Sequence, residues 1–416
     1  MEAQRNAVAG RWRAPASRGW TGIVSLMLVV ALLLVACQDA DPDVAAEEPD
    51  DEGGVDEPAD DDPGAEEPAD ETDADGDETG ETYELRYSSP AAGISVLGTG
   101  ADWWADRVNE LTDGQMSIET FHDSSLLDAT ETLPGVQDGR TDIGYLVNFF
   151  LSDDLPLFDV AGMPFVSEDA EAILHTLDDL YDTNQAFEEE FADQDLHVLF
   201  FMPVGSGIMA FTEPVEDIDD LAGKRVRSSG LTAFVSEEVG ADPVFLPPTE
   251  IFEAVQRGII DGIVGLDFDL TVAFGYHEAA EQFVQPGLGQ YASVAVAINR
   301  DLWDSLPSDI QDALDQASEE YMDEIAIDYL NEANERACDR LLEEGGSVSV
   351  WDEAATDEWL ETVTSERVHD RWLQQVTERG VAEDDAAQFL DEFLAGVESR
   401  EGTGSYSDGA RLCAER

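Results

Sequence analysis

The chain has 416 residues, and its 95 acidic and 20 basic residues give a formal net charge of -75. This length is enough for two or three domains, and the scarcity of Lys and Arg excludes a general nucleic-acid binder, because phosphate contacts need clustered cations. Residues 38–82 hold 22 of the acidic residues and no basic one, yet residues 83–416 are strongly acidic too, which suits a halophilic or salt-tolerant source because salt screens the repulsion between carboxylates.

The first residues have the pattern of an export signal. Four arginines between residues 5 and 18 precede the apolar run Ile23–Val35, which is too short to span a bilayer comfortably. The run ends in Leu34-Val35-Ala36-Cys37, which resembles a bacterial lipobox. We expect residues 1–36 to be a lipoprotein signal peptide and lipidated Cys37 to anchor the chain to the outer face of the cell membrane. An ordinary signal peptide that happens to contain a cysteine is the alternative.

The next segment, residues 37–82, is rich in Asp, Glu, Pro, Gly and Ala. Such a composition cannot bury enough apolar surface to offset the entropy of ordering. The segment is therefore predicted to be a disordered, self-repelling tether that holds the folded part away from the membrane. A metal-buffering acidic tail is the alternative interpretation.

The folded part begins with alternating strand and helix patterns. Period-two alternation or short apolar runs predict strands, and an apolar stripe predicts a helix. The expected elements are a strand at 83–87, a helix at 98–111, a strand at 115–121, a helix at 128–138 and a strand at 141–147. The same order returns as a strand at 224–228, a helix at 231–239, a strand at 243–246, a helix at 250–257 and a strand at 259–265. Strands alternating with helices imply parallel sheets covered on both faces.

Both units carry the motif Val-Gln-x-Gly-x-x-Asp at the same place, in residues 136–142 and 255–261. Two such units imply two lobes, and the cleft between two α/β lobes is a natural site for a small ligand. The stretch Pro307–Glu344 has no internal Gly or Pro, and it predicts one or two long helices that run across the back of both lobes.

Two further cysteines, Cys338 and Cys413, lie in the folded part. In an exported protein they are candidates for a disulfide that would pin the C-terminal tail to the long helix. Two unpaired thiols are the alternative.

Four stretches resemble the DctP-type receptors of tripartite ATP-independent periplasmic (TRAP) transporters. They are Asp217–Gly230, Gly240–Pro247, Glu250–Gly262 and Ile298–Pro307. Each stretch is weak evidence alone, but the four in this order are specific, and the resemblance covers most of residues 83–345. It implies an α/β clamshell like that of periplasmic binding proteins, in which each lobe is a mostly parallel sheet flanked by helices and a long helix spans both lobes.

The resemblance also implies a function and partners. Such receptors capture a small organic acid and deliver it to membrane permease subunits driven by an ion gradient; they are not enzymes and hold no cofactor. We assign residues 83–205 and about 291–332 to lobe I, and residues 206–290 and about 333–416 to lobe II.

Arg227 is the strongest site prediction, because it matches the family arginine that binds the substrate carboxylate and because a guanidinium offers two parallel donors to the two carboxylate oxygens. Ser228 follows it at the expected cleft edge. Asn148 could donate its amide to the ligand or cap the strand end, and Phe149 could pack on the apolar part of the ligand or belong to the core. Arg225 is interpreted as structural or surface.

The chain departs from the family pattern in two respects, one of which is that Ile263-Val264-Gly265-Leu266-Asp267 follows Asp261-Gly262, where many members carry an Asn or an acidic-aromatic pair. Many members carry a second arginine before the second lobe, but residues 205–209 contain none. This favours a monocarboxylate, including a bulky or aromatic one, over a dicarboxylate. Asp267 and Asp269 could instead meet a cationic group or a metal ion, and an ectoine-like solute would suit the arginine and these acids together; no metal is predicted.

Catalysis is not indicated by any motif. The chain lacks Gly-x-Ser-x-Gly, His-Glu-x-x-His and a Walker loop, and its five histidines are scattered. The alternative within binding proteins is a receptor of an ABC transporter, which also has two lobes and a lipobox.

Overall fold

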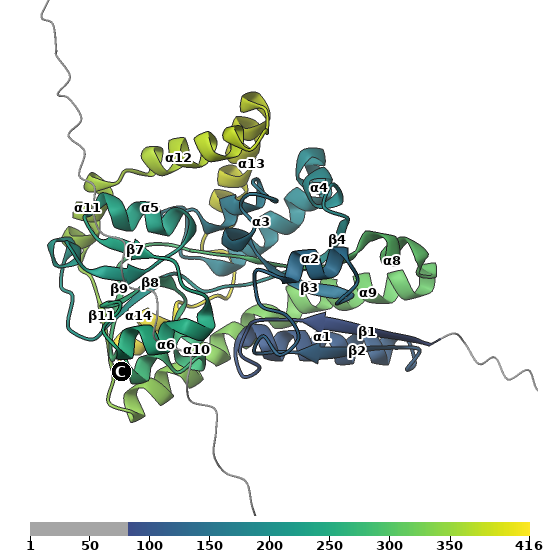
Figure 1. The fold of residues 1–416 in the computed structure, drawn as a ribbon, viewed down its shortest axis with the longest axis horizontal. Coiled ribbons are helices and arrows are strands. Elements are labelled where there is room, and N and C mark those ends of the chain that lie inside the picture. The colour runs from purple at the N-terminus through teal and green to yellow at the C-terminus, as the bar shows by residue number, and fades with distance from the viewer. Residues whose placement is uncertain (1–81) are drawn as a thin grey trace, which may run out of the picture. The chain divides into compact units, whose positions relative to one another are not determined.

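The computed structural model describes residues 82–416, and these begin with the alternating strands and helices that the sequence predicted (Figure 1). The first unit consists of β1 (Tyr83–Ser88), α1 (Val96–Leu111), β2 (Met116–Phe121), α2 (Thr132–Gln137) and β3 (Ile143–Val147). Helix α1 starts two residues before the expected position because the Ser95 hydroxyl accepts a hydrogen bond from the Gly98 N–H and caps the helix. The predicted leader, Cys37 and the acidic tether lie outside the described residues.

The second unit repeats this order. It consists of β6 (Arg225–Arg227), α5 (Gly230–Glu238), β7 (Asp242–Val244), α6 (Pro248–Gln256) and β8 (Gly262–Leu266), after which α7 (Phe268–Ala273) begins. In both units the first strand, β1 or β6, lies between the other two and pairs in parallel with each of them. The two parallel triplets are therefore copies of one arrangement.

The strands form two sheets, which correspond to the two predicted lobes. The first has the order β2-β1-β3-β10-β4, and the second β11-β9-β5-β8-β6-β7. The added strands are β4 (Leu196–Met202), β5 (Ile208–Phe211), β9 (Gln282–Gln285), β10 (Val294–Asn299) and β11 (Ser347–Val350). Strands β10 and β5 run antiparallel to both of their neighbours, because each enters its sheet after the chain has crossed from the other one.

The chain crosses between the sheets through two extended segments, residues 203–207 and 286–293. These segments lie against one another, and the Gly207 N–H donates to the Gly289 carbonyl over 2.7 Å. We call the two segments together the hinge, because they are strand-to-strand connections at which two sheets can rotate.

The predicted long helix forms a third connection. It consists of α9 (Ser308–Glu320), a π-helical turn at Tyr321–Ile325 and α10 (Ala326–Glu343). Helix α9 packs on α1 and β4 of the first sheet, and α10 packs on α7 of the second, so the element spans both lobes as expected. The π-helical turn lies between the two halves, and such turns occur often at functional sites.

The remaining helices cover the sheets. They are α3 (Ala170–Thr183), α4 (Gln185–Ala192), α8 (Arg300–Ser305), α11 (Glu353–Thr362), α12 (Ser365–Glu378), α13 (Glu383–Arg400) and α14 (Gly409–Ala414), with short 3-10 turns at Asn148–Phe150, Phe158–Gly162, Ile218–Leu221 and Tyr276–Glu278. Helix α13 packs on α3, and the Phe389 and Phe187 rings are 5.0 Å apart. The expected placement of residues 333–416 in lobe II therefore does not describe α13, which adds to the side of the first sheet.

The motif shared by the two units has the same structural role in each. In the first unit, the Arg86 Nε donates to Asp142 Oδ2 over 3.0 Å and its Nη2 to the Gly139 carbonyl over 3.0 Å. In the second, the Arg225 Nε donates to Asp261 Oδ2 over 3.2 Å and its Nη2 to the Gly258 carbonyl over 2.9 Å. The repeated Gly and Asp thus hold an arginine on the first strand of each unit.

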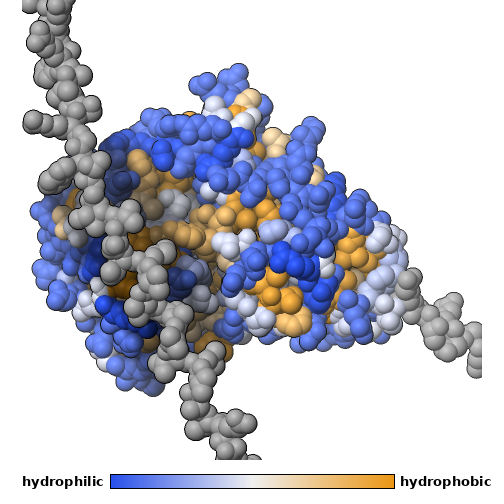
Figure 2. Space-filling view, in the orientation of Figure 1, coloured by the Kyte–Doolittle hydropathy of each residue, from blue (hydrophilic) through white to orange (hydrophobic). Residues whose placement is uncertain are grey.

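Apolar side chains fill the space between sheets and helices, and Trp104, Trp359 and Trp372 are among the largest fully buried ones. On the face shown in Figure 2, hydrophilic residues cover most of the periphery and hydrophobic residues gather toward the middle. Within residues 82–416, no helix is both long and apolar enough to cross a membrane.

Candidate ligand-binding site

Arg227 is the last residue of β6, and its side chain points into the interior between the two sheets. The residue is 1% exposed. Arg225, two residues earlier, projects from the same face of the strand. It lies at the other end of the strand, however, where it pairs with Asp261. The short strand therefore presents one arginine to a structural partner and one to the interior.

The Arg227 guanidinium lacks an anionic partner among the described residues. Its Nε donates to the Leu246 carbonyl over a long 3.4 Å, and its Nη1 has no hydrogen-bond partner in residues 82–416. Burial lowers the pKa of the guanidinium below its ordinary value, although arginine stays charged in proteins. A buried and unpaired charge is costly, so this position favours an anion from outside the chain.

Apolar and aromatic side chains form a cavity of about 40 Å³ beside Arg227. The first sheet contributes Tyr145 and Val147 on β3 and Phe149 just after it, and the second contributes Leu266 at the end of β8 and Leu270 on α7. The hinge adds Val204, Tyr291 and Ala292. Among its lining residues, only Arg227 carries a charge, so the site combines one cation with an apolar wall.

The cleft around this cavity is closed by contacts between the two lobes. The Arg227 guanidinium lies 5.7 Å from the centre of the Phe149 ring, a cation–π contact. The Phe150 ring meets the Phe245 ring edge-on at 5.8 Å. The Val96 N–H of α1 donates over 2.9 Å to Asp269 Oδ2 of α7. A space of 40 Å³ holds no more than a few waters, so an organic ligand enters when the lobes part.

Asn148 and Asp267 occupy equivalent positions, directly after the third strand of each unit, and both are fully buried. Asn148 Oδ1 accepts from the Ser293 N–H over 3.1 Å, and Asp267 Oδ2 accepts from the Gly205 N–H over 3.1 Å. Each side chain therefore holds one of the two hinge segments. Burial and the neighbouring Asp269 carboxylate raise the pKa of Asp267 above its ordinary value.

Two of the five predicted ligand-binding residues line the cavity, and three do not. Arg227 and Phe149 line it. Ser228 is buried beside Arg227 with its hydroxyl unpaired among the described residues, but it is not part of the lining. One oxygen of Asn148 and one of Asp267 bind the hinge, while Asn148 Nδ2 donates to Asp159 and Asp267 Oδ1 accepts the Leu270 N–H. The roles of these three residues toward a ligand stay predictions.

Several lining residues were missed by the sequence analysis. Tyr145 has the pattern of a core strand residue, and Phe274 and Tyr291 lie outside the strands and helices that the repeat made visible. The glycines at positions 287 and 289, both with positive φ, were the one signal of an unusual backbone near Tyr291. Contacts across the cleft depend on the tertiary arrangement and leave no local pattern.

Cys338 and Cys413 are joined by a disulfide, with their Cα atoms 5.4 Å apart. The bridge links α10 to α14, so the C-terminal tail is fixed to the helix that spans both lobes.

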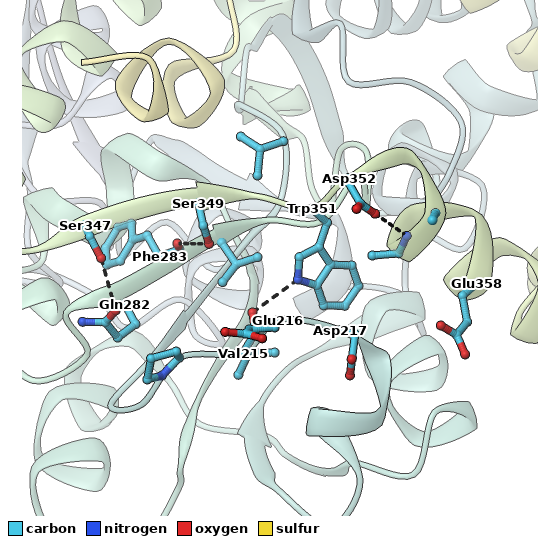
Figure 3. Close-up of a pocket in the computed structure, with 15 residues that line it drawn as sticks. Val215, Glu216, Asp217, Gln282, Phe283, Ser347, Ser349, Trp351, Asp352 and Glu358 are labelled. Carbon is cyan, nitrogen blue, oxygen red and sulfur yellow. Dashed lines mark hydrogen bonds between the residues drawn. The ribbon is translucent and has the colours of Figure 1, made fainter.

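A larger groove of about 600 Å³ lies elsewhere, at the edge of the second sheet (Figure 3). Trp351 points into it and donates its indole N–H to the Val215 carbonyl over 3.3 Å, and Glu216, Asp217 and Glu358 lie around it. No cation lines this groove, so it does not suit an organic acid. The smaller cavity at Arg227 is therefore the candidate site.

Within residues 82–416, one cluster of side chains has metal-ligating chemistry. Ligand atoms of His277, Glu278 and Glu344 lie within 4.8 Å of one another. Arg340 already approaches both carboxylates, with its Nε 3.1 Å from Glu344 and its Nη2 3.7 Å from Glu278. A guanidinium in this position supplies the charge that a metal would supply, so we describe the cluster as an ion-pair network.

Comparison with known proteins places the chain among solute-binding proteins. The "Monocarboxylate 2-oxoacid-binding periplasmic protein" of Nostoc sp. is 26% identical over 237 residues, which cover 55% of this chain and 64% of that protein. The "C4-dicarboxylate-binding periplasmic protein" of Rhodobacter capsulatus is 25% identical over 237 residues, covering 56% of this chain and 69% of that protein. The aligned part of this chain thus spans less than two thirds of the Nostoc protein.

Solved structures show the same fold. A TRAP solute-binding protein from a marine metagenome, specific for aromatic acid ligands and in complex with 3-hydroxybenzoate, has a TM-score of 0.69 at 20% identity; the match covers 77% of this chain and 99% of that one. The family model for DctP, bacterial extracellular solute-binding protein family 7, matches residues 87–374. This match covers more than half of the 416-residue chain. The chain therefore belongs to the DctP family of bacterial extracellular solute-binding proteins.

Proposed function

We propose that this protein is the extracytoplasmic receptor of a TRAP transporter and that it captures a monocarboxylate with an apolar, preferably aromatic, body. The observation that carries the proposal is the buried Arg227 guanidinium, which lacks an anionic partner among residues 82–416 and faces an aromatic cavity. A bound carboxylate would supply two acceptor oxygens to the guanidinium. The apolar part of the ligand would displace water from Tyr145, Phe149 and Tyr291.

The lining argues against more polar ligands. A dicarboxylate or a uronic acid would bury a second charge or several hydroxyls against Leu266, Leu270 and Val147 without partners, and each unsatisfied polar group is costly. An ectoine-like solute would need an acid for its cationic part. Asp267 and Asp269 do not serve, because both carboxylates accept backbone N–H groups.

Two relatives support this class of ligand. The Nostoc protein is named for monocarboxylate 2-oxoacids, and the marine metagenome protein is described as specific for aromatic acids. Their ligands share one carboxylate, as the single Arg227 would require.

The proposal extends to the location and the partner. Lipidated Cys37 would hold the receptor on the outer face of the cell membrane, the acidic tether would give it reach, and TRAP membrane subunits would receive the ligand when the lobes open. The receptor role involves capture and release without chemical change of the ligand. The acidic surface would suit a saline habitat.

A ligand panel tests the proposal. Calorimetric titrations with benzoate, phenylacetate and 4-methyl-2-oxopentanoate should give binding, whereas succinate, glucuronate and ectoine should bind weakly or not at all. Glycerol serves as a neutral blank. Binding restricted to dicarboxylates, uronates or ectoine would contradict the proposed ligand class, and absence of binding by every organic acid would contradict the receptor assignment.

A further inference from the structure

A segment near the C-terminus, Glu401–Cys413, crosses the hinge and lies beyond the residues that the family model matches. The family model ends at residue 374, so the match does not extend to this segment. We call it the strap. It leaves α13, which packs on the side of the first sheet, and it ends in α14, which packs on β11 of the second sheet. The strap therefore connects the two lobes by a route of its own.

Side chains of the strap bind Ser206, in one hinge segment, and Gln285, which directly precedes the other. The Ser206 N–H donates to the Tyr406 hydroxyl over 3.4 Å, and the Ser206 hydroxyl donates to Asp408. Gln285, at the end of β9, donates from Nε2 to Asp408 Oδ2 over 2.8 Å and to the Ser206 hydroxyl over 2.7 Å. Ser206 and Gln285 are both fully or almost fully buried, so water does not compete readily for these bonds.

The hinge segment around Gly205 is held from two sides. Asp267 of the second lobe accepts the Gly205 N–H over 3.1 Å. A Cβ atom at Gly205 would lie 3.3 Å from the Asp267 Cβ and 3.4 Å from the Tyr406 hydroxyl. Glycine at this position therefore allows the strap and the second lobe to pack closely on this hinge segment.

The strap is also fixed at its ends to both lobes. On the first, Asp169 accepts the Gly402 N–H over 2.9 Å, and Glu171 accepts the N–H groups of Ser405 and Tyr406 over 2.6 and 3.0 Å. On the long helix, Asn331 donates to the Ser405 carbonyl over 3.0 Å and accepts the Ser407 N–H over 2.9 Å. The Cys338–Cys413 disulfide completes the attachment.

We propose that Tyr406 and Asp408 are positioning residues that hold the hinge in its closed arrangement, so that the strap sets how strongly the receptor retains its ligand. Rotation of the sheets at the hinge would move Ser206 and Gln285 against a strap fixed to both lobes. These bonds thus stabilise the closed state relative to the open one. Because apparent affinity scales with the population of the binding-competent state, loss of the strap contacts weakens binding without touching the ligand site. The effect on affinity rests on the proposed function; the effect on the hinge does not.

The test uses the full chain with the double variant Tyr406→Phe and Asp408→Asn, which removes the hydroxyl and the Oδ2 acceptor but retains Oδ1, the acceptor for the Arg411 N–H that caps α14. Leu412→Ala, at an exposed strap residue, is the matched control. Spin labels at Glu119→Cys on β2 and Glu253→Cys on α6, both exposed, in a Cys37→Ser background, report the distance between the lobes in ligand-free protein.

We expect the double variant to shift this distance toward a longer, broader distribution, and to weaken binding of the best monocarboxylate by about three- to tenfold through faster dissociation. The control should match the parent in both. An unchanged distance distribution overturns the proposal, whatever the affinity does. If no acid binds, the proposed function fails while the distance still decides the role of the strap. If the double variant does not fold, Tyr406→Phe alone is measured in the same way.

Discussion

Asp159 is a buried carboxyl that the ligand site does not use. It is 4% exposed, and within the described residues its carboxylate receives one long hydrogen bond, from Asn148 Nδ2 at 3.4 Å. Burial raises its pKa to about 7, although the Arg379 charge and the Asn148 bond act in the opposite direction. Asn148 also accepts the Ser293 N–H of the hinge. Asp159 therefore supports the hinge through Asn148.

The raised pKa gives a prediction for stability against pH. A carboxyl with a raised folded-state pKa contributes stability that is complete below its unfolded value, near 4, and is lost as the pH rises through 7. The Asp159→Asn variant cannot lose a proton there. Chemical denaturation at pH 5 and pH 8 should therefore show the parent losing on the order of 2 kcal/mol more than the variant. Exposed Asp193→Asn is the control; equal losses in parent and Asp159→Asn would refute the assignment.

At the residue scale, the family motif around Arg227 made it the strongest site prediction, and Arg225, interpreted as structural or surface, pairs with Asp261. It could not predict what Asn148 and Asp267 do. A polar residue after a buried strand can face a ligand or a neighbouring backbone, and the choice depends on hinge segments far away in the sequence.

At the scale of elements, the disulfide closes a loop of 75 residues that contains β11 and helices α11 to α13. Constraining so long a loop in the unfolded chain should stabilise the folded state by about 2–4 kcal/mol. Denaturation of the parent with and without reductant, beside Cys413→Ser, measures this difference. The reductant should leave Cys413→Ser unchanged, and a parent insensitive to reductant would mean that the bridge does not constrain the fold.

The two repeated units were predictable because each strand and helix carries its own apolar period, and the alternation fixes parallel pairing. The pairing of the antiparallel strands β5 and β10 was harder to predict from the sequence, since it depends on where the chain crosses between the sheets. Helix α13 was assigned to the wrong side for a similar reason. Its apolar stripe predicts burial but does not say against which sheet, and it packs on α3.

At the scale of the whole molecule, the net charge of -75 makes repulsion between carboxylates a general cost of folding. Added salt shortens the range of this repulsion from about 10 Å at 0.1 M to about 3 Å at 1 M. The midpoint of thermal unfolding should therefore rise by several degrees over this range. NaCl and KCl should act alike, because screening depends on ionic strength, and a midpoint that stays constant or falls would contradict a salt-adapted surface.

Titration calorimetry of Arg227→Ala with the best monocarboxylate of the panel measures whether Arg227 binds the ligand carboxylate. We expect a loss of about 2–5 kcal/mol, which is about thirtyfold or more in affinity. Thermal stability of the ligand-free protein should be kept or raised, because an unpaired buried charge is removed. Arg257→Ala, at an exposed arginine paired with Glu253, should bind as the parent does. Unchanged affinity in Arg227→Ala would mean that Arg227 does not bind the ligand carboxylate.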